Sequence, residues 1–144
     1  MAEQNFSNHG RFFPPFHFFV VPVMIINFGW SIYRWKLSAF SLDGFVAVVV
    51  AAALALGFLC VRRMALSVQD RVIRLEERLR YEHLLPADLK PRIGEFTVSQ
   101  CVSLRFASDA ELPALARKVL DEKLNQRKAI KQLVKNWNPD YLRA

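Results

Sequence analysis

Residues 45–61 read FVAVVVAAALALGFLCV, seventeen positions without a formal charge that end at Arg62-Arg63. An α-helix rises about 1.5 Å per residue, so roughly 20 apolar residues cross a hydrocarbon layer of about 30 Å, and long flanking side chains supply the remaining length. The stretch therefore predicts a helix that crosses a membrane.

A second uncharged stretch, residues 16–33, comes earlier in the chain and ends at Arg34. The small residues of a signal-peptide cleavage site do not follow it, so we expect it to be retained as a second crossing helix. The predicted fold class is all-α: a transmembrane helical hairpin over residues 16–61 that continues into a cytoplasmic helix and a small helical module. An amino-terminal interfacial segment, residues 1–15, precedes the hairpin.

Charged residues concentrate after the second stretch. Of the 20 Lys and Arg residues, 17 follow Val61, together with 11 of the 13 acidic residues. This division excludes an ordinary soluble enzyme domain. The two uncharged stretches take up most apolar residues of the first half, so few of them are left to form a soluble core. Basic segments stay on the cytoplasmic side of a membrane, so both chain termini are predicted to be cytoplasmic.

Small and polar side chains mark a predicted packing surface in the two crossing helices. Ala47, Ala51 and Ala55 recur at four-residue intervals, which lets two helix backbones approach closely. Asn27 is a strongly polar side chain near the middle of the first helix, where an unpaired amide is costly. We expect these four residues to pack within the hairpin or between subunits.

A membrane-proximal helix is predicted over residues 62–85, because the chain has no Gly or Pro there to stop it. Its apolar residues are spaced four, three and four positions apart, as in a coiled coil, and form a seam of Val68, Val72, Leu75 and Leu79. Two interpretations are equally open: the seam associates with another chain, or it packs on the domain that follows. We also expect charge pairs on the helix surface, Asp70 with Arg74 and Glu76 with Arg80.

A cytoplasmic helical module is predicted over residues 86–144. It begins with a linker marked by Pro86, Pro91 and Gly94, and its helices follow this linker. Two capping boxes predict helix starts, Thr97 with Gln100 and Ser108 with Glu111. Asn125 is a candidate cap for a last helix that runs to Asn138-Pro139.

Two of these helices carry apolar faces that we expect to pack antiparallel as the core of the module. The predicted core consists of Leu112, Leu115, Val119, Ile130, Leu133 and Trp137. The last helix also carries a basic strip, which consists of Arg127, Lys128, Lys131 and Lys135. A solvated face is its plain interpretation, and contact with anionic lipid or a partner is the functional one. Nucleic acid is disfavoured because aromatic residues do not interleave with the basic ones.

The usual motifs of phosphate, metal and nucleophile chemistry are missing from the sequence, so catalytic, cofactor-binding and metal-binding residues are not predicted. Cys60 and Cys101 lie in different halves of the chain and are expected to be reduced. His9 and His17 could bind a haem or a quinone head group, but haem between two helices of one chain would need a second His in residues 45–61, and none is there, so only an assembly could complete a haem site. We therefore expect neither an enzyme nor a cofactor.

Several short runs resemble the signature of an uncharacterised family of small bacterial membrane proteins with two transmembrane helices. These runs are QNFSNH at 4–9, PPFHFF at 14–19, QDR at 69–71, LEERLR at 75–80, LRFASD at 104–109, ELP at 111–113, Ile130-Lys131, KNW at 135–137 and PDYLR at 139–143. The resemblance spans nearly the whole chain and implies the hairpin topology and a bacterial inner membrane. It brings no catalytic or binding residues with it.

These features predict a non-enzymatic integral membrane protein that acts by assembly. It would be a homo-oligomer or a small accessory subunit of a larger membrane complex, with membrane lipids and other subunits as partners. The alternative is a membrane-tethered binding module whose basic helical cytoplasmic end recruits a soluble partner or an anionic lipid surface.

Overall fold

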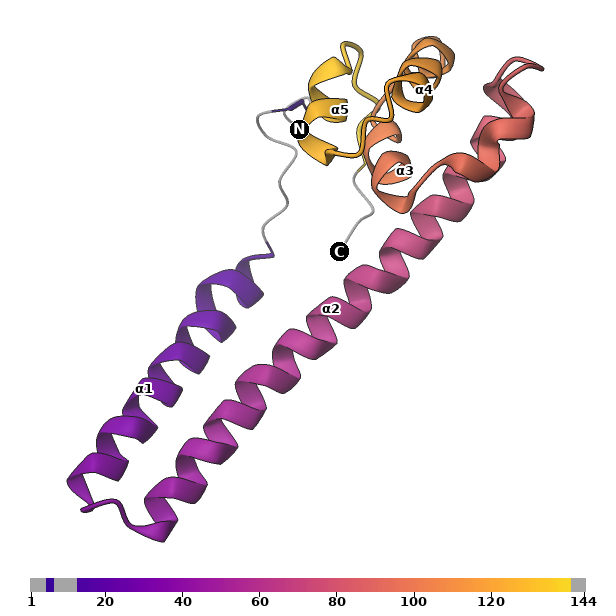
Figure 1. Ribbon diagram of the computed structural model, residues 1–144. Helices are drawn as coiled ribbons and strands as arrows, with labels where there is room; N and C mark the ends of the chain where they lie inside the picture. Colours follow the sequence, from indigo (N-terminus) through magenta and orange to yellow (C-terminus); the bar gives the residue numbers. More distant parts are fainter. Residues whose placement is uncertain (1–4, 7–12, 141–144) are drawn as a thin grey trace. The chain divides into compact units, whose positions relative to one another are not determined.

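The computed structural model describes residues 5–6 and 13–140, and every regular element in that part of the chain is helical (Figure 1). This confirms the all-α class. The chain divides into two compact units. We call residues 11–66 the apolar unit, and residues 67–144 together with 1–10 the module unit.

The first helix of the apolar unit begins with a π-helical turn, η1 (Pro15–Val20), and continues as α1 (Val21–Leu37). Pro22, at the start of α1, has no N–H to donate, which breaks the regular α-helical hydrogen-bond ladder at this point. The helix is longer than the predicted 16–33, because the charged residues Arg34 and Lys36 form its last turn.

Residues 38–41 form a tight turn between α1 and α2 (Leu42–Leu84). Ala39 and Phe40 take left-handed backbone angles, φ 50° and 59°. The indole N–H of Trp35 donates to the carbonyl of Ser41 at 3.1 Å. A Cβ atom at Gly44 would lie 2.6 Å from Cδ1 of Trp35, so this close approach requires glycine.

Helix α2 is a single helix of 43 residues and joins the two segments predicted as 45–61 and 62–85. Within the apolar unit α2 lies beside the first helix, as shown by the ring of Phe16 in η1, which stacks on that of Phe58 with centroids 4.8 Å apart. The guanidinium of Arg62 lies 5.0 Å from the centroid of the same Phe16 ring.

Both helices are long and apolar enough to cross a membrane. The most apolar stretch of each of these two helices has almost no buried residue. The core helix of a soluble protein would have most of this surface covered by its own chain.

The module unit combines the end of α2 with four short helices. These are η2 (Lys90–Glu95), α3 (Val98–Leu104), α4 (Leu112–Asp121) and α5 (Arg127–Leu133). Its core takes Tyr81 from α2 and Leu85 from the position just after that helix, and the Tyr81 ring lies 4.9 Å from that of Phe96. The compact unit therefore starts at residue 67 rather than at the expected boundary of 86, because the end of α2 supplies core side chains.

The predicted capping box at Thr97 and Gln100 is confirmed, with both of its reciprocal hydrogen bonds present. The predicted capping box at Ser108 and Glu111 is wrong. The Glu111 carboxylate instead accepts hydrogen bonds from the backbone N–H groups of Lys135 and Asn136, both at 3.0 Å. Asn125 does not cap α5, since the residue before that helix is Gln126.

The last helix ends at Leu133, so the prediction that Trp137 belongs to its apolar face is wrong. Val134 has extended backbone angles, the chain bends at residues 135–136, and Ala107 and Trp137 form an isolated antiparallel β-bridge. Its backbone hydrogen bonds join Ser108 N–H to the Asn136 carbonyl at 3.0 Å and Asn138 N–H to the Phe106 carbonyl at 2.7 Å. Trp137 still packs on the core, with its ring 4.9 Å from that of Phe106.

Candidate interaction surface

The part of α2 inside the module unit has two opposite faces. Ile73, Glu77 and Tyr81 are spaced four residues apart and are buried. The predicted seam lies about half a helical turn away and is open, with Val68 61%, Val72 49%, Leu75 61% and Leu79 53% exposed. The seam therefore does not pack on the domain that follows it, which was one of its two interpretations.

Arg80 fastens α2 to the loop that follows α3. Its Nη2 lies 2.6 Å from Oδ1 of Asp109 and donates to the carbonyl of Ala107 at 2.6 Å. Its Nε donates to the same Asp109 oxygen at 2.9 Å, and Nη1 donates to Glu77 at 3.4 Å. The predicted pair of Arg80 with Glu76 does not form, because these partners occupy the guanidinium.

A second link joins α5 to α2. Nη2 of Arg127 lies 3.0 Å from Oδ2 of Asp70, and Nε of the same guanidinium donates to Ser99 on α3 at 3.3 Å. The sequence predicted that Asp70 pairs with Arg74. In the structure Asp70 pairs with Arg127 instead. Both arginine links attach the module to the side of α2 away from the seam.

A buried polar cluster lies beneath Arg80. The Tyr81 hydroxyl is buried and interacts electrostatically with the Glu77 carboxyl and the Cys101 thiol. Burial raises the pKa of Glu77 above its ordinary value, although the charge of Arg80 acts in the opposite direction. Burial also raises the pKa of Tyr81 and of Cys101, so these groups stay neutral at physiological pH.

We predict that Glu77→Gln makes the module more stable than the wild type at neutral pH and removes part of its pH dependence. A raised native pKa means that the stabilising contribution of the protonated carboxyl is fully present below the unfolded pKa, about 4.3. That contribution is lost as the pH rises through the higher native pKa. Urea unfolding of both proteins between pH 4 and pH 8 checks this, and a difference that stays constant with pH would contradict it.

The predicted basic strip is not one surface. Arg127 is paired with Asp70, and Nζ of Lys131 lies 4.9 Å from the centroid of the Phe106 ring. Lys128 is exposed on α5, whereas Lys135 lies beyond the end of that helix. The shortened helix therefore separates residues that the predicted helix would have aligned.

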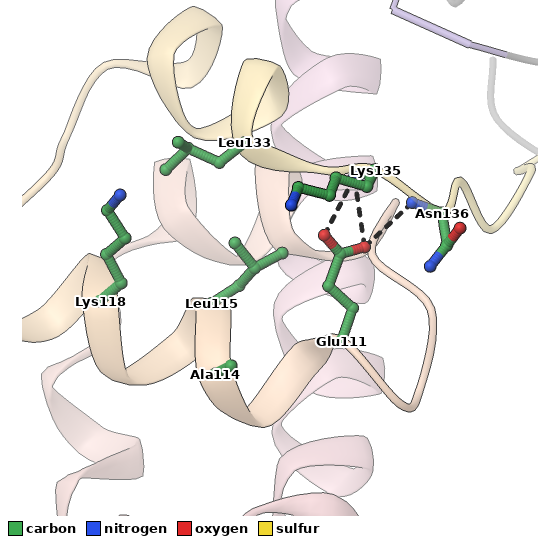
Figure 2. A pocket seen from close by; sticks show the side chains of 7 residues that line it. All are labelled: Glu111, Ala114, Leu115, Lys118, Leu133, Lys135 and Asn136. Atoms are coloured by element: carbon green, nitrogen blue, oxygen red, sulfur yellow. Dashed lines mark hydrogen bonds between the residues drawn. The ribbon is translucent and has the colours of Figure 1, made fainter.

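A shallow pocket that the sequence did not indicate lies between α4 and the segment after α5 (Figure 2). Its volume is about 390 Å³, and its apolar lining includes Leu115 and Leu133. Lys118 and Lys135 supply positive charge, while the Glu111 carboxylate is held by backbone N–H groups, as Figure 2 shows. The pocket brings residues of the predicted core and the predicted basic strip together.

The predicted core residues lie where their helices meet. Leu112, Leu115, Val119 and Ile130 are buried, and Leu133 and Trp137 are partly buried against the same core. The sequence pattern did not identify Tyr81, Phe96 and Phe106 as core residues, although each is almost completely buried.

The predicted small-residue surface in the apolar unit divides between two environments. Ala51 is 3% exposed and Ala55 is half-buried, whereas Ala47 and Asn27 are exposed. Ser31, which the sequence analysis did not identify, is also buried. Its hydroxyl donates to the backbone carbonyl of Asn27 at 2.8 Å. Ala51 therefore packs within the chain.

The described residues do not contain three His, Cys, Asp or Glu side chains grouped closely enough to hold a metal ion. Nδ1 of His17 accepts a hydrogen bond from the backbone N–H of Phe13 at 3.2 Å. His9 lies outside the described residues. Both cysteines are free, Cys60 exposed and Cys101 buried.

The architecture defines a class of all-α protein in which two long, uncovered apolar helices are joined to a small helical module with an open apolar seam. The chain belongs to the family of unknown function DUF6526, whose family model matches residues 1–144. Neither the curated proteins nor the solved structures contain a match to the chain.

Proposed function

We propose that this protein is a non-enzymatic integral protein of a bacterial inner membrane and that it acts by assembly. It would do so as a homo-oligomer or as a small accessory subunit of a larger membrane complex. The observation that carries the proposal is apolar surface that the chain leaves uncovered. Lipid accounts for this surface on the two long helices, and a protein partner accounts for it on the seam, which follows the charged pair Arg62-Arg63.

The proposed orientation has both termini in the cytoplasm and the turn at residues 38–41 outside. The basic residues after Val61 support it, because positive segments stay on the cytoplasmic side. We expect Ala39→Cys, in a Cys60→Ser background, to react with a membrane-impermeant thiol reagent in intact cells. Reaction only after lysis would reverse the proposed orientation.

Assembly is tested by purifying the tagged full chain from native membranes in a mild detergent. We expect it to migrate with a second copy or with other membrane proteins, and Leu75→Glu to abolish this, because a charge in an apolar contact is costly to desolvate. Glu122→Lys, on the exposed end of α4, is the matched control. A wild-type chain recovered only as a monomer would contradict the proposal.

The runner-up function is a membrane-tethered binding module whose basic end recruits a soluble partner or an anionic lipid surface. Lys118 and Lys135 beside the apolar pocket support it, as does the exposed Lys128. Replacing Lys128 and Lys135 by Glu should then abolish recruitment while Leu75→Glu spares it. The favoured function predicts the opposite pattern.

A further inference from the structure

We propose that the seam of α2 binds the seam of a second copy of this chain, as a parallel two-stranded coiled coil. This deepens the proposed function, on which it rests. Parallel alignment follows from that function, because two copies inserted with the same orientation send α2 out of the same face of the membrane.

The spacing of the seam fixes its register. With Ala65, Val72 and Leu79 at the a positions of a heptad, Val68 and Leu75 occupy the d positions. Val at a followed by Leu at d, as in Val72 and Leu75, is the combination that favours two strands over three or four. All four larger side chains of the seam are exposed in the single chain and available to a partner.

The module does not obstruct this contact. It attaches to α2 through Ile73, Glu77 and Tyr81, which occupy positions b, f and c of the same heptad, on the outer side of a coiled coil. Arg80 and Asp70, which hold the module, also lie on that side. Each copy can therefore carry its module outward.

The charges beside the seam identify the occupant. Arg71 is at position g and Glu76 at position e, and in a parallel pair a g residue meets the e residue five positions later in the other chain. Both side chains are exposed, and neither forms an ion pair within the described residues. A second copy supplies each of them with an opposite charge, twice per dimer by symmetry. The next pair of positions, Arg78 and His83, brings no acid, so Arg71 and Glu76 set the register.

Single cysteines test the contact in native membranes, with the full chain and Cys60→Ser; Cys101 is buried and can stay. Under mild oxidation we expect Val72→Cys and Leu75→Cys to form disulfide-linked dimers. Ser67→Cys is the matched control, because it is exposed on the same helix at position c, away from the seam. Equal cross-linking at position 67 would overturn the proposal.

Charge exchange tests the register. Arg71→Glu replaces both attractive pairs by repulsion, so we expect the dimerisation constant in detergent to fall about 5- to 30-fold. Glu76→Arg alone should do the same. The double variant Arg71→Glu with Glu76→Arg restores opposite charges and should return the constant to within about threefold of the wild type. A double variant as weak as the single variants would overturn the register.

The outcomes separate this inference from the function on which it rests. If position 72 does not cross-link and the chain purifies with a different membrane protein, the proposal that a second copy binds the seam is wrong. The proposal that the protein acts by assembly still stands. If the chain neither cross-links nor retains any partner, both fail.

Discussion

Tyr81→Ala is expected to unfold the short helices α3, α4 and α5 of the module unit while α2 stays helical. Tyr81 has 0% exposed surface, belongs to the core and contacts the Phe96 ring. Truncation of a buried large aromatic side chain costs about 3–5 kcal/mol, which is as much as a single core of this size usually supplies. Amide hydrogen exchange in α3 and α4 measures the effect, and we expect protection there to be lost.

Leu79→Ala is the control for this substitution, since Leu79 is on the same helix but exposed. At a protein concentration in detergent that is low enough for the chains to be monomeric, its effect should stay within about 0.5 kcal/mol. Equal loss of protection in both variants would mean that the two faces of α2 are not distinct. That result would contradict the core as described.

Arg80→Ala is expected to cost about 2–4 kcal/mol, because it removes hydrogen bonds to the Ala107 carbonyl and Asp109 and leaves the buried Glu77 without its cation. Denaturant unfolding of the module unit in the full chain measures this. The matched control is Arg117→Ala. Its ion pair with Asp88 has the same 2.6 Å length, but the Arg117 side chain is 49% exposed against 16% for Arg80. We expect the control to cost less than about 1 kcal/mol.

Adding Glu77→Gln to Arg80→Ala distinguishes the two sources of this loss. If an unpaired buried carboxylate causes part of the cost, the double variant should be more stable than Arg80→Ala alone. No recovery would assign the whole effect to the Ala107 and Asp109 contacts. Equal costs for Arg80→Ala and Arg117→Ala would contradict the role of Arg80 in joining α2 to the loop after α3.

Features with a local cause could be predicted from the sequence. The capping box at Thr97 and Gln100 closes within four residues, so its hydrogen bonds depend on little else. The long α2 follows from the absence of helix breakers after Arg62. The apolar positions of α4 were also correct, because one helix face repeats at a fixed spacing wherever the helix packs.

Features that depend on distant partners could not be predicted. Glu111 was expected to cap its own helix and instead binds backbone groups of residues 135 and 136. That contact, with the bridge between Ala107 and Trp137, holds the chain out of a helical conformation after Val134, so the last helix ends early. Arg80 and Asp70 likewise form ion pairs with residues far along the chain, rather than with the neighbours on α2 that the sequence predicted.

The candidate interaction surface was half predicted. The spacing of Val68, Val72, Leu75 and Leu79 identified the seam, but spacing alone could not say whether the chain covers it. That depends on where the module attaches, and the residues that decide this, Ile73 and Tyr81, carry no distinct local signal. The significance of Arg71 and Glu76 follows only once their neighbours Asp70 and Arg80 are paired elsewhere.

The tight turn at residues 38–41 has a consequence for the biogenesis of a chain that enters a membrane as proposed. The connection between α1 and α2 is short, and Trp35 is bound to Ser41 and packed over Gly44. We therefore expect the two helices to enter the bilayer as a pair. The segment that has to cross brings with it Arg34 and Lys36 from the last turn of α1 and Asp43 from the first turn of α2, so its translocation moves two positive charges and one negative charge.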